Sequence, residues 1–201
     1  GGVNVNAPRR TFAEVKEMNL GTKVTSKTDK READYFTVVA TITTIAQSAD
    51  RKPWYEANPD LNSDAKNCKV TSMGDGKWRC EKNGKVYNGY IPRYILRFCA
   101  TDFTGNIWLT AYDESAQKIL KKTAKESETL FINDRPKYEQ IFKEAQFKKY
   151  VFKCRAWSDV WEDSQRVRYD VLGVQIADPQ QESEKLIEKI QFLQNLKNSS
   201  N

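Results

Sequence analysis

Apolar and polar residues alternate along residues 94–112, YILRFCATDFTGNIWLTAY, and this pattern predicts two strands joined by a turn near Gly105. Side chains of a strand point alternately to opposite faces, so three aliphatic residues of the second strand share one face. The opposite face carries the rings of Trp108 and Tyr112. Two interpretations remain open: these rings stack on flat bases, or a second layer of structure covers them.

The same kind of pattern predicts three further strands, over residues 35–46, 150–157 and 166–176. Between them, one helix is expected to begin at Asp113 and another at Asp134. The order is therefore strand, long excursion, two strands, helical segment and two strands. This is the order of a mainly β, five-stranded barrel of the OB type, whose exposed face and loops bind single strands or sugars.

Shifts in composition divide the chain into several parts. These are an N-terminal extension with a short helix (residues 1–34), the OB-fold domain (residues 35–178), an insertion between its first two strands (residues 47–92) and a C-terminal helix (residues 179–201). In the extension, Thr11 and Glu14 have the spacing of a capping box, which predicts a helix over residues 12–19.

The insertion has small loops and turn pairs, and Asn83-Gly84 is typical of a hairpin turn, so we expect a three-stranded meander. It also contains Cys68 and Cys80. These are weak candidates for metal ligands, because a structural zinc site needs four nitrogen or sulfur ligands. We therefore expect the chain to bind no cofactor. The alternative is that it binds a zinc ion.

Beyond Pro179, residues 180–197 have the periodicity of a helix with a wide apolar stripe. Its members are Leu186, Ile187, Ile190, Leu193 and Leu196. Two interpretations are open: the stripe packs back on the barrel, or it binds partner proteins.

The composition of the chain indicates which classes of molecule it binds and which activities are not expected. The chain has 33 Lys and Arg against 27 Asp and Glu, a formal net charge of +6 and a pI near 9.0, which favours an anionic partner such as nucleic acid. Histidine is absent, and no phosphate-binding glycine motif is present, so no enzyme is expected. No apolar run approaches the ~20 residues of a membrane span, which predicts an intracellular protein with no membrane contact.

Aromatic and basic residues from the two predicted hairpins would flank the groove of an OB barrel. The candidate DNA-binding residues are Phe103, Trp108, Tyr112, Lys153, Arg155, Trp161 and Arg168. Bases stack on such rings, and cations along the groove neutralise phosphates. The alternative is that Phe103 belongs to the core and the charges only solvate the outer sheet.

From Thr11 to the last helix, the sequence resembles the C-terminal DNA-binding domain of the replication protein A large subunit. The resemblance is carried by Trp78-Arg-Cys-Glu-Lys82, Asp102-Phe103, Ile107-Trp108-Leu-Thr and Phe152-Lys-Cys-Arg155. It implies a nuclear protein with an OB barrel, a zinc ribbon between its first two strands and a helix that joins two smaller OB-fold subunits. It also implies base stacking on Trp108, Tyr112 and Trp161 and a basic contact from Arg168.

The sequence departs from that family at the ribbon. The second and third of the family's four zinc-binding cysteines are present as Cys68 and Cys80, whereas Asn58 and Asn83 occupy the first and fourth positions. This departure favours a specialised branch, similar to the ciliate telomerase subunit that holds telomeric G-rich single-stranded DNA. The alternatives are the general replication subunit and a protein that mainly scaffolds a heterotrimer.

Overall fold

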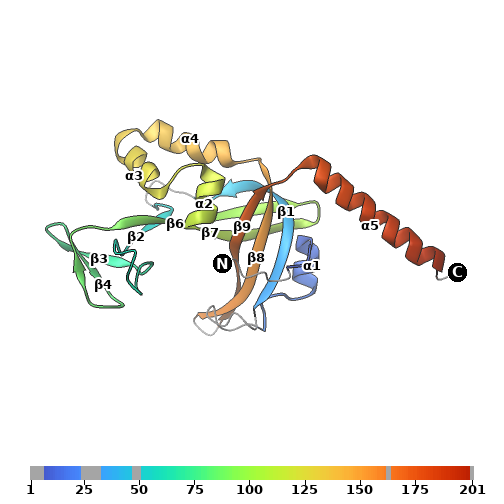
Figure 1. Ribbon diagram of the computed structural model, residues 1–201, viewed down its shortest axis with the longest axis horizontal. Coiled ribbons are helices and arrows are strands. Elements are labelled where there is room, and N and C mark those ends of the chain that lie inside the picture. The colour runs from blue at the N-terminus through green and yellow to red at the C-terminus, as the bar shows by residue number, and fades with distance from the viewer. Residues whose placement is uncertain (1–6, 24–32, 47–50, 162–163, 200–201) are drawn as a thin grey trace.

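The structure is a computed structural model that describes residues 7–23, 33–46, 51–161 and 164–199 (Figure 1). It is mainly β, with short helices at one end of a curled sheet and a long helix at the C-terminus. None of the helices in the described part of the chain is long and apolar enough to span a membrane.

The main sheet has six strands in the order β1-β8-β9-β7-β6-β2. Their bounds are β1 (Asp34–Ile45), β2 (Trp54–Ala57), β6 (Ile91–Asp102), β7 (Gly105–Tyr112), β8 (Lys149–Trp161) and β9 (Ser164–Ile176). The predicted OB-type order of strands is confirmed. The prediction of five strands was wrong, because β2, which lies in the predicted insertion, pairs with β6 along the edge of the sheet.

The sheet curls until β1, which pairs with β8, also pairs with β6. β7 and β9 are joined by a short parallel pairing, which consists of the pairs Thr110–Asp170 and Ala111–Val171. In the described part of the chain the join between β7 and β9 thus consists of only two residue pairs, so the barrel is not closed by extended strand pairing there, in contrast to the barrel that we predicted from the sequence.

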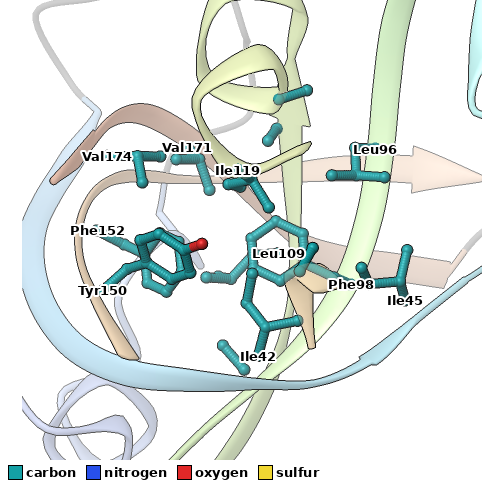
Figure 2. Packing of buried hydrophobic residues seen from close by; sticks show 14 of the residues in the cluster. Ile42, Ile45, Leu96, Phe98, Leu109, Ile119, Tyr150, Phe152, Val171 and Val174 are labelled. Atoms are coloured by element: carbon teal, nitrogen blue, oxygen red, sulfur yellow. The ribbon is translucent and has the colours of Figure 1, made fainter. Parts of the chain in front are cut away.

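The core lies inside this curl. Alternate residues of β1, β6 and β7 face inward along most of their length, as the period of a strand requires. Figure 2 shows Ile42, Phe98, Leu109 and Phe152 pointing into a common interior, and all four are fully buried. On β7 the same alternation leaves Trp108 42% exposed. Tyr112 on the same face is 36% exposed, so no second layer in the described residues covers these rings, and the interpretation of the rings as buried was wrong.

Three helices, instead of the two expected, follow β7: α2 (Asp113–Leu120), α3 (Ala124–Asn133) and α4 (Arg135–Ala145). α2 ends at Lys121, which has a left-handed φ of 54°, and a capping box at Thr123 and Glu126 then begins α3. Asp134 caps α4 as predicted, because its side chain accepts the backbone N–H of Lys137. These helices cover one end of the sheet (Figure 1).

The predicted N-terminal helix is present as α1 (Phe12–Glu17), and the predicted capping box of Thr11 and Glu14 is formed. Phe12 and Val15 are fully buried in the same core as the strands. α1 is therefore part of the packed domain, so a boundary drawn at residue 34 divides a single core.

The insertion forms a separate three-stranded sheet, in the order β3-β4-β5, as predicted for a meander. Its strands are β3 (Val70–Gly74), β4 (Lys77–Cys80) and β5 (Val86–Tyr87). A small cluster of Ala65, Val70 and Cys80 forms its own core. We call residues 58–90 the ribbon lobe.

The C-terminal helix is α5 (Pro179–Ser199), which projects away from the sheet (Figure 1). A salt bridge of 2.8 Å between Arg9 and Glu182 fastens its first turn to the N-terminal segment. The apolar stripe is between 46% and 59% exposed at Leu186, Ile187, Ile190, Leu193 and Leu196. The alternative that this stripe packs back on the barrel was therefore wrong.

Candidate nucleic-acid interface

Trp108 of β7 lies on the outer face of the sheet beside Arg97 of β6. The guanidinium of Arg97 lies over the indole, with 5.3 Å between its central carbon and the ring centroid. This is a cation–π distance, so the arginine both restrains the ring and adds positive charge beside it. We did not predict Arg97 from the sequence, although it alternates with the buried residues Leu96 and Phe98 and therefore shares the outer face.

A hollow of about 290 Å³ lies next to this pair on the same face. Four of its lining residues are basic and two are aromatic: Arg51, Lys52, Arg97, Tyr112, Trp157 and Arg168. We call it the basic hollow. Arg168 forms an ion pair with Asp159, with 3.7 Å between a guanidinium nitrogen and a carboxylate oxygen. Both side chains are about 40% exposed, so water surrounds the pair. The arrangement combines flat rings with cations, which suits a single strand of nucleic acid.

A second hollow of about 430 Å³ lies between the sheet and the ribbon lobe. We call it the lobe-side hollow. Among the residues that line it are Tyr55 of β2, Arg93 of β6 and Leu172 of β9. Tyr112 and Asp170 line both hollows, so the Tyr112 side chain lies at the boundary between them.

Three of the predicted binding residues come together on this outer face. Trp108 and Tyr112 are 42% and 36% exposed, and Arg168 lines the basic hollow beside Tyr112. Trp161 is paired with Ser164 through the backbone, but its side chain lies outside the described residues. The hairpin of β8 and β9 thus contributes at least one of its predicted residues to the face.

The other three predicted residues do not line the basic hollow. Phe103 is 91% exposed in the turn between β6 and β7, so the alternative that placed it in the core was wrong. Arg155 is only 7% exposed and lines the lobe-side hollow. Lys153 lies opposite Gly173 of β9, further along β8, and lines neither hollow.

Trp157 is a member of the face that we did not predict from the sequence. It pairs with Arg168 across the β8–β9 ladder and lines the basic hollow. A signal was available, because the residues of β8 alternate and Trp157 follows Arg155 at the next position of the same face.

The ribbon lobe provides a test of the zinc site that the family resemblance implies. Asn58, at the first cysteine position, is fully buried, and its side-chain oxygen accepts the backbone N–H of Asp60 at 2.9 Å. Asn83, at the fourth position, likewise accepts the backbone N–H of Lys85 at 3.0 Å. Both amide oxygens are therefore engaged with the backbone.

The amide nitrogens of the same two residues meet at one hydroxyl. Asn58 and Asn83 donate to the oxygen of Tyr87 at 3.3 Å and 3.1 Å. Within the described part of the chain, no group of three or more His, Cys, Asp or Glu side chains could hold a metal ion. These residues do not fit a zinc site, and a hydrogen-bonded bridge joins the two positions instead.

Comparison with known proteins places these features in context. The family model described as "Replication factor-A C terminal domain" matches residues 35–186. Replication factor A protein 1 of Schizosaccharomyces pombe is 35% identical over 189 residues, which are 94% of this chain and 29% of that protein. The replication protein A 70 kDa DNA-binding subunit of Xenopus tropicalis is 33% identical over 190 residues, with the same two coverages. The chain thus spans less than a third of the length of either relative.

Two solved structures have the same fold over most of the chain. A replication protein A heterotrimer bound to ssDNA matches with a TM-score of 0.78 and 31% identity, covering 92% of this chain and 40% of that one. Yeast RPA bound to ssDNA matches with a TM-score of 0.73 and 28% identity, covering 93% of this chain and 98% of that one. The chain belongs to the replication factor A C-terminal domain family.

Proposed function

We propose that this chain is the C-terminal part of a replication protein A large subunit, without enzymatic activity, and that it binds single-stranded DNA on its outer face. The observation that carries the proposal is the pair of exposed rings, Trp108 and Tyr112, next to the cations of the basic hollow. The relatives support it, since the Xenopus protein is named a DNA-binding subunit and both solved neighbours are described as bound to ssDNA.

Bases stack on Trp108 and Tyr112, and each stacked base contributes roughly 1–3 kcal/mol. Arg51, Lys52, Arg97 and Arg168 lie around the hollow where phosphates would pass. Each neutralised phosphate releases counterions, so the logarithm of affinity should fall with the logarithm of salt concentration by about 0.7 per contact.

The remaining predicted residues add further contacts with the DNA strand in this proposal. Trp161, in the hairpin of β8 and β9, is a third stacking position, and the exposed Phe103 and the half-buried Lys153 are peripheral contacts. Arg155 acts from below the surface, because it is buried beneath the lobe-side hollow.

The apolar stripe of α5 is the proposed contact with the two smaller subunits of a heterotrimer. Its five aliphatic residues are exposed along a helix that projects from the sheet, and exposed helical stripes of this kind bind partner helices (Figure 1). Such an assembly would act in the nucleus, in DNA replication and repair.

The function is tested by titrating an oligothymidine strand with the full chain and with Trp108→Ala and Tyr112→Ala. Phe192→Ala, which removes a 62% exposed ring on α5, is the matched control. The proposal expects weaker binding for the first two variants and unchanged binding for the control. Parent-like affinity in both face variants would exclude this face as the DNA site.

A second candidate is a specialised subunit of telomerase that binds telomeric G-rich repeats. The observation that favours it is the replacement of two ribbon cysteines by Asn58 and Asn83, whereas the curated relatives favour the general replication role. Competition between a G-rich repeat strand and a scrambled strand of equal composition separates the two candidates. Equal affinity supports general replication, and a strong preference for the repeat supports telomerase.

A further inference from the structure

Asp170 is an acidic residue in the middle of a face that we propose to bind phosphates. It lies on β9, is only 5% exposed and lines both hollows. A carboxylate at this place repels a nucleic-acid strand, and its burial costs free energy unless hydrogen bonds satisfy it. Its presence therefore requires a structural explanation.

The contacts of Asp170 supply that explanation. The indole N–H of Trp157 on β8 donates a hydrogen bond to one carboxylate oxygen at 3.1 Å. The hydroxyl of Tyr112 on β7 donates to the other oxygen at 3.4 Å, a longer and weaker contact. A single carboxylate thus links aromatic residues of two strands that flank β9.

The position of Asp170 in the sheet makes these links important. Asp170 belongs to one of the two residue pairs through which β9 and β7 are joined. The backbone ladder is short here, so the hydrogen bond to Tyr112 adds a side-chain connection across the same seam. On its other side, Asp170 lies directly opposite the buried Arg155 of β8.

We propose that Asp170 is the positioning residue of the binding face: its carboxylate holds the side chains of Tyr112 and Trp157 in the orientation that stacks on bases. This inference rests on the proposed binding of single-stranded DNA. Two effects of the carboxylate then oppose each other, because its charge repels phosphates while its hydrogen bonds order the rings.

Replacing Asp170 shows which effect is larger. Asp170→Asn removes the charge and keeps one acceptor oxygen, so repulsion alone predicts tighter binding, whereas a positioning role predicts weaker binding. We expect the affinity for an oligothymidine strand to fall about five- to thirtyfold. Asp170→Ala should lower this affinity further, because it removes both hydrogen bonds to the rings.

Asp159→Asn is the matched control. Asp159 also lines the basic hollow, but its partner is the cation of Arg168, 3.7 Å away, and its side chain is 40% exposed. Its neutralisation should strengthen binding, since it removes repulsion and releases Arg168. Tighter binding in both Asp→Asn variants would overturn the proposal.

A double-mutant cycle distinguishes positioning from a general loss of stability. Tyr112→Phe keeps the ring and removes its hydroxyl, so Asp170→Ala should weaken binding less in that background than in the parent. If Asp170 only stabilised the fold, its variants would melt earlier but bind normally below the melting temperature. That result would also overturn the proposal.

Trp108→Ala is measured in the same experiment. Weak binding by Trp108→Ala together with parent-like binding by the Asp170 variants would refute the role of Asp170 and leave the DNA-binding face intact. Parent-like binding by Trp108→Ala and by all other variants would instead refute the proposed function itself.

Discussion

The guanidinium of Arg97 lies over the indole of Trp108, 5.3 Å from the ring centroid. Arg97 is opposite Thr110 in the β6–β7 ladder, and Trp108 is opposite Cys99, so the two side chains meet on a diagonal of the outer face. This diagonal contact joins a stacking surface to a cation, and the two parts make different contributions to binding.

These contributions can be separated by salt. Trp108→Ala should weaken binding of single-stranded DNA by roughly 1–3 kcal/mol at every salt concentration, because it removes a stacking surface. Arg97→Gln should also weaken binding, and it should lower the salt slope by about 0.7, the value for one phosphate contact. Fluorescence titrations at four salt concentrations measure both quantities, and an unchanged slope in Arg97→Gln would show that this arginine acts only on the ring.

The ribbon lobe should remain folded without metal. Tyr87→Phe removes the hydroxyl that joins Asn58 and Asn83, and it should cost about 1–3 kcal/mol because Asn58 is buried. Tyr55→Phe is the control, since that hydroxyl donates to an exposed carbonyl, and it should cost less. A metal chelator should leave the melting temperature unchanged. A chelator-induced decrease would contradict the hydrogen-bonded bridge.

Charges on the apolar stripe of α5 should prevent assembly without unfolding the chain. Ile190 and Leu193 are 46% and 50% exposed, so replacing both by Glu should shift the melting temperature little. Binding to the two smaller subunits of a replication protein A heterotrimer, measured by size-exclusion chromatography, should be lost. Gln191→Glu with Asn195→Glu adds the same charge on the opposite side of the helix and should bind normally. Loss of binding in both double variants would point to charge instead of the stripe.

Replacing Gly21 by a residue with a side chain should lower the free energy of unfolding. Its φ is +86°, and a Cβ there would lie 2.9 Å from the Ala156 Cβ and the Trp157 backbone nitrogen. Gly21→Ala should therefore cost about 1–3 kcal/mol or more in urea denaturation, through both strain and overlap. Gly76 has a similar φ of +71° but open space around it, so Gly76→Ala isolates the conformational part. An equal loss of stability in Gly21→Ala and Gly76→Ala would show that neighbouring atoms move to relieve the overlap at Gly21.

Alkaline pH should destabilise the domain through Tyr90. Burial, and then the hydrogen bond from its hydroxyl to Glu128, raise the pKa of Tyr90 from 10.0 to about 12. A raised pKa in the folded state favours folding below pH 10, and this contribution is lost as the pH rises through about 12. The free energy of unfolding should therefore fall less steeply over this range in Tyr90→Phe than in the parent. Identical pH profiles would contradict this assignment.

Short-range pattern was sufficient for much of the fold. Alternation along β6 and β7 predicted both the hairpin and the position of Trp108 on the face opposite the aliphatic residues, because the period of a strand is a local property of the backbone. Thr11 and Asp134 likewise identified helix starts, since each cap bonds within three residues of itself.

Contacts between distant segments could not be predicted in the same way. Nothing local places β2 beside β6, Arg97 over Trp108 or Tyr87 between Asn58 and Asn83, because each depends on how separate segments approach. Trp157 had a local signal in the alternation of β8, but its contact with Asp170 depends on the pairing of β8 with β9.

The sequence by itself therefore determined the order of strands, the outward direction of Trp108 and Tyr112, and the basic character of the chain. Only the tertiary structure decided which cations and which carboxylate accompany those rings. The physical reason is that a side chain's direction depends on its own strand, whereas its neighbours depend on the register and curl of the whole sheet.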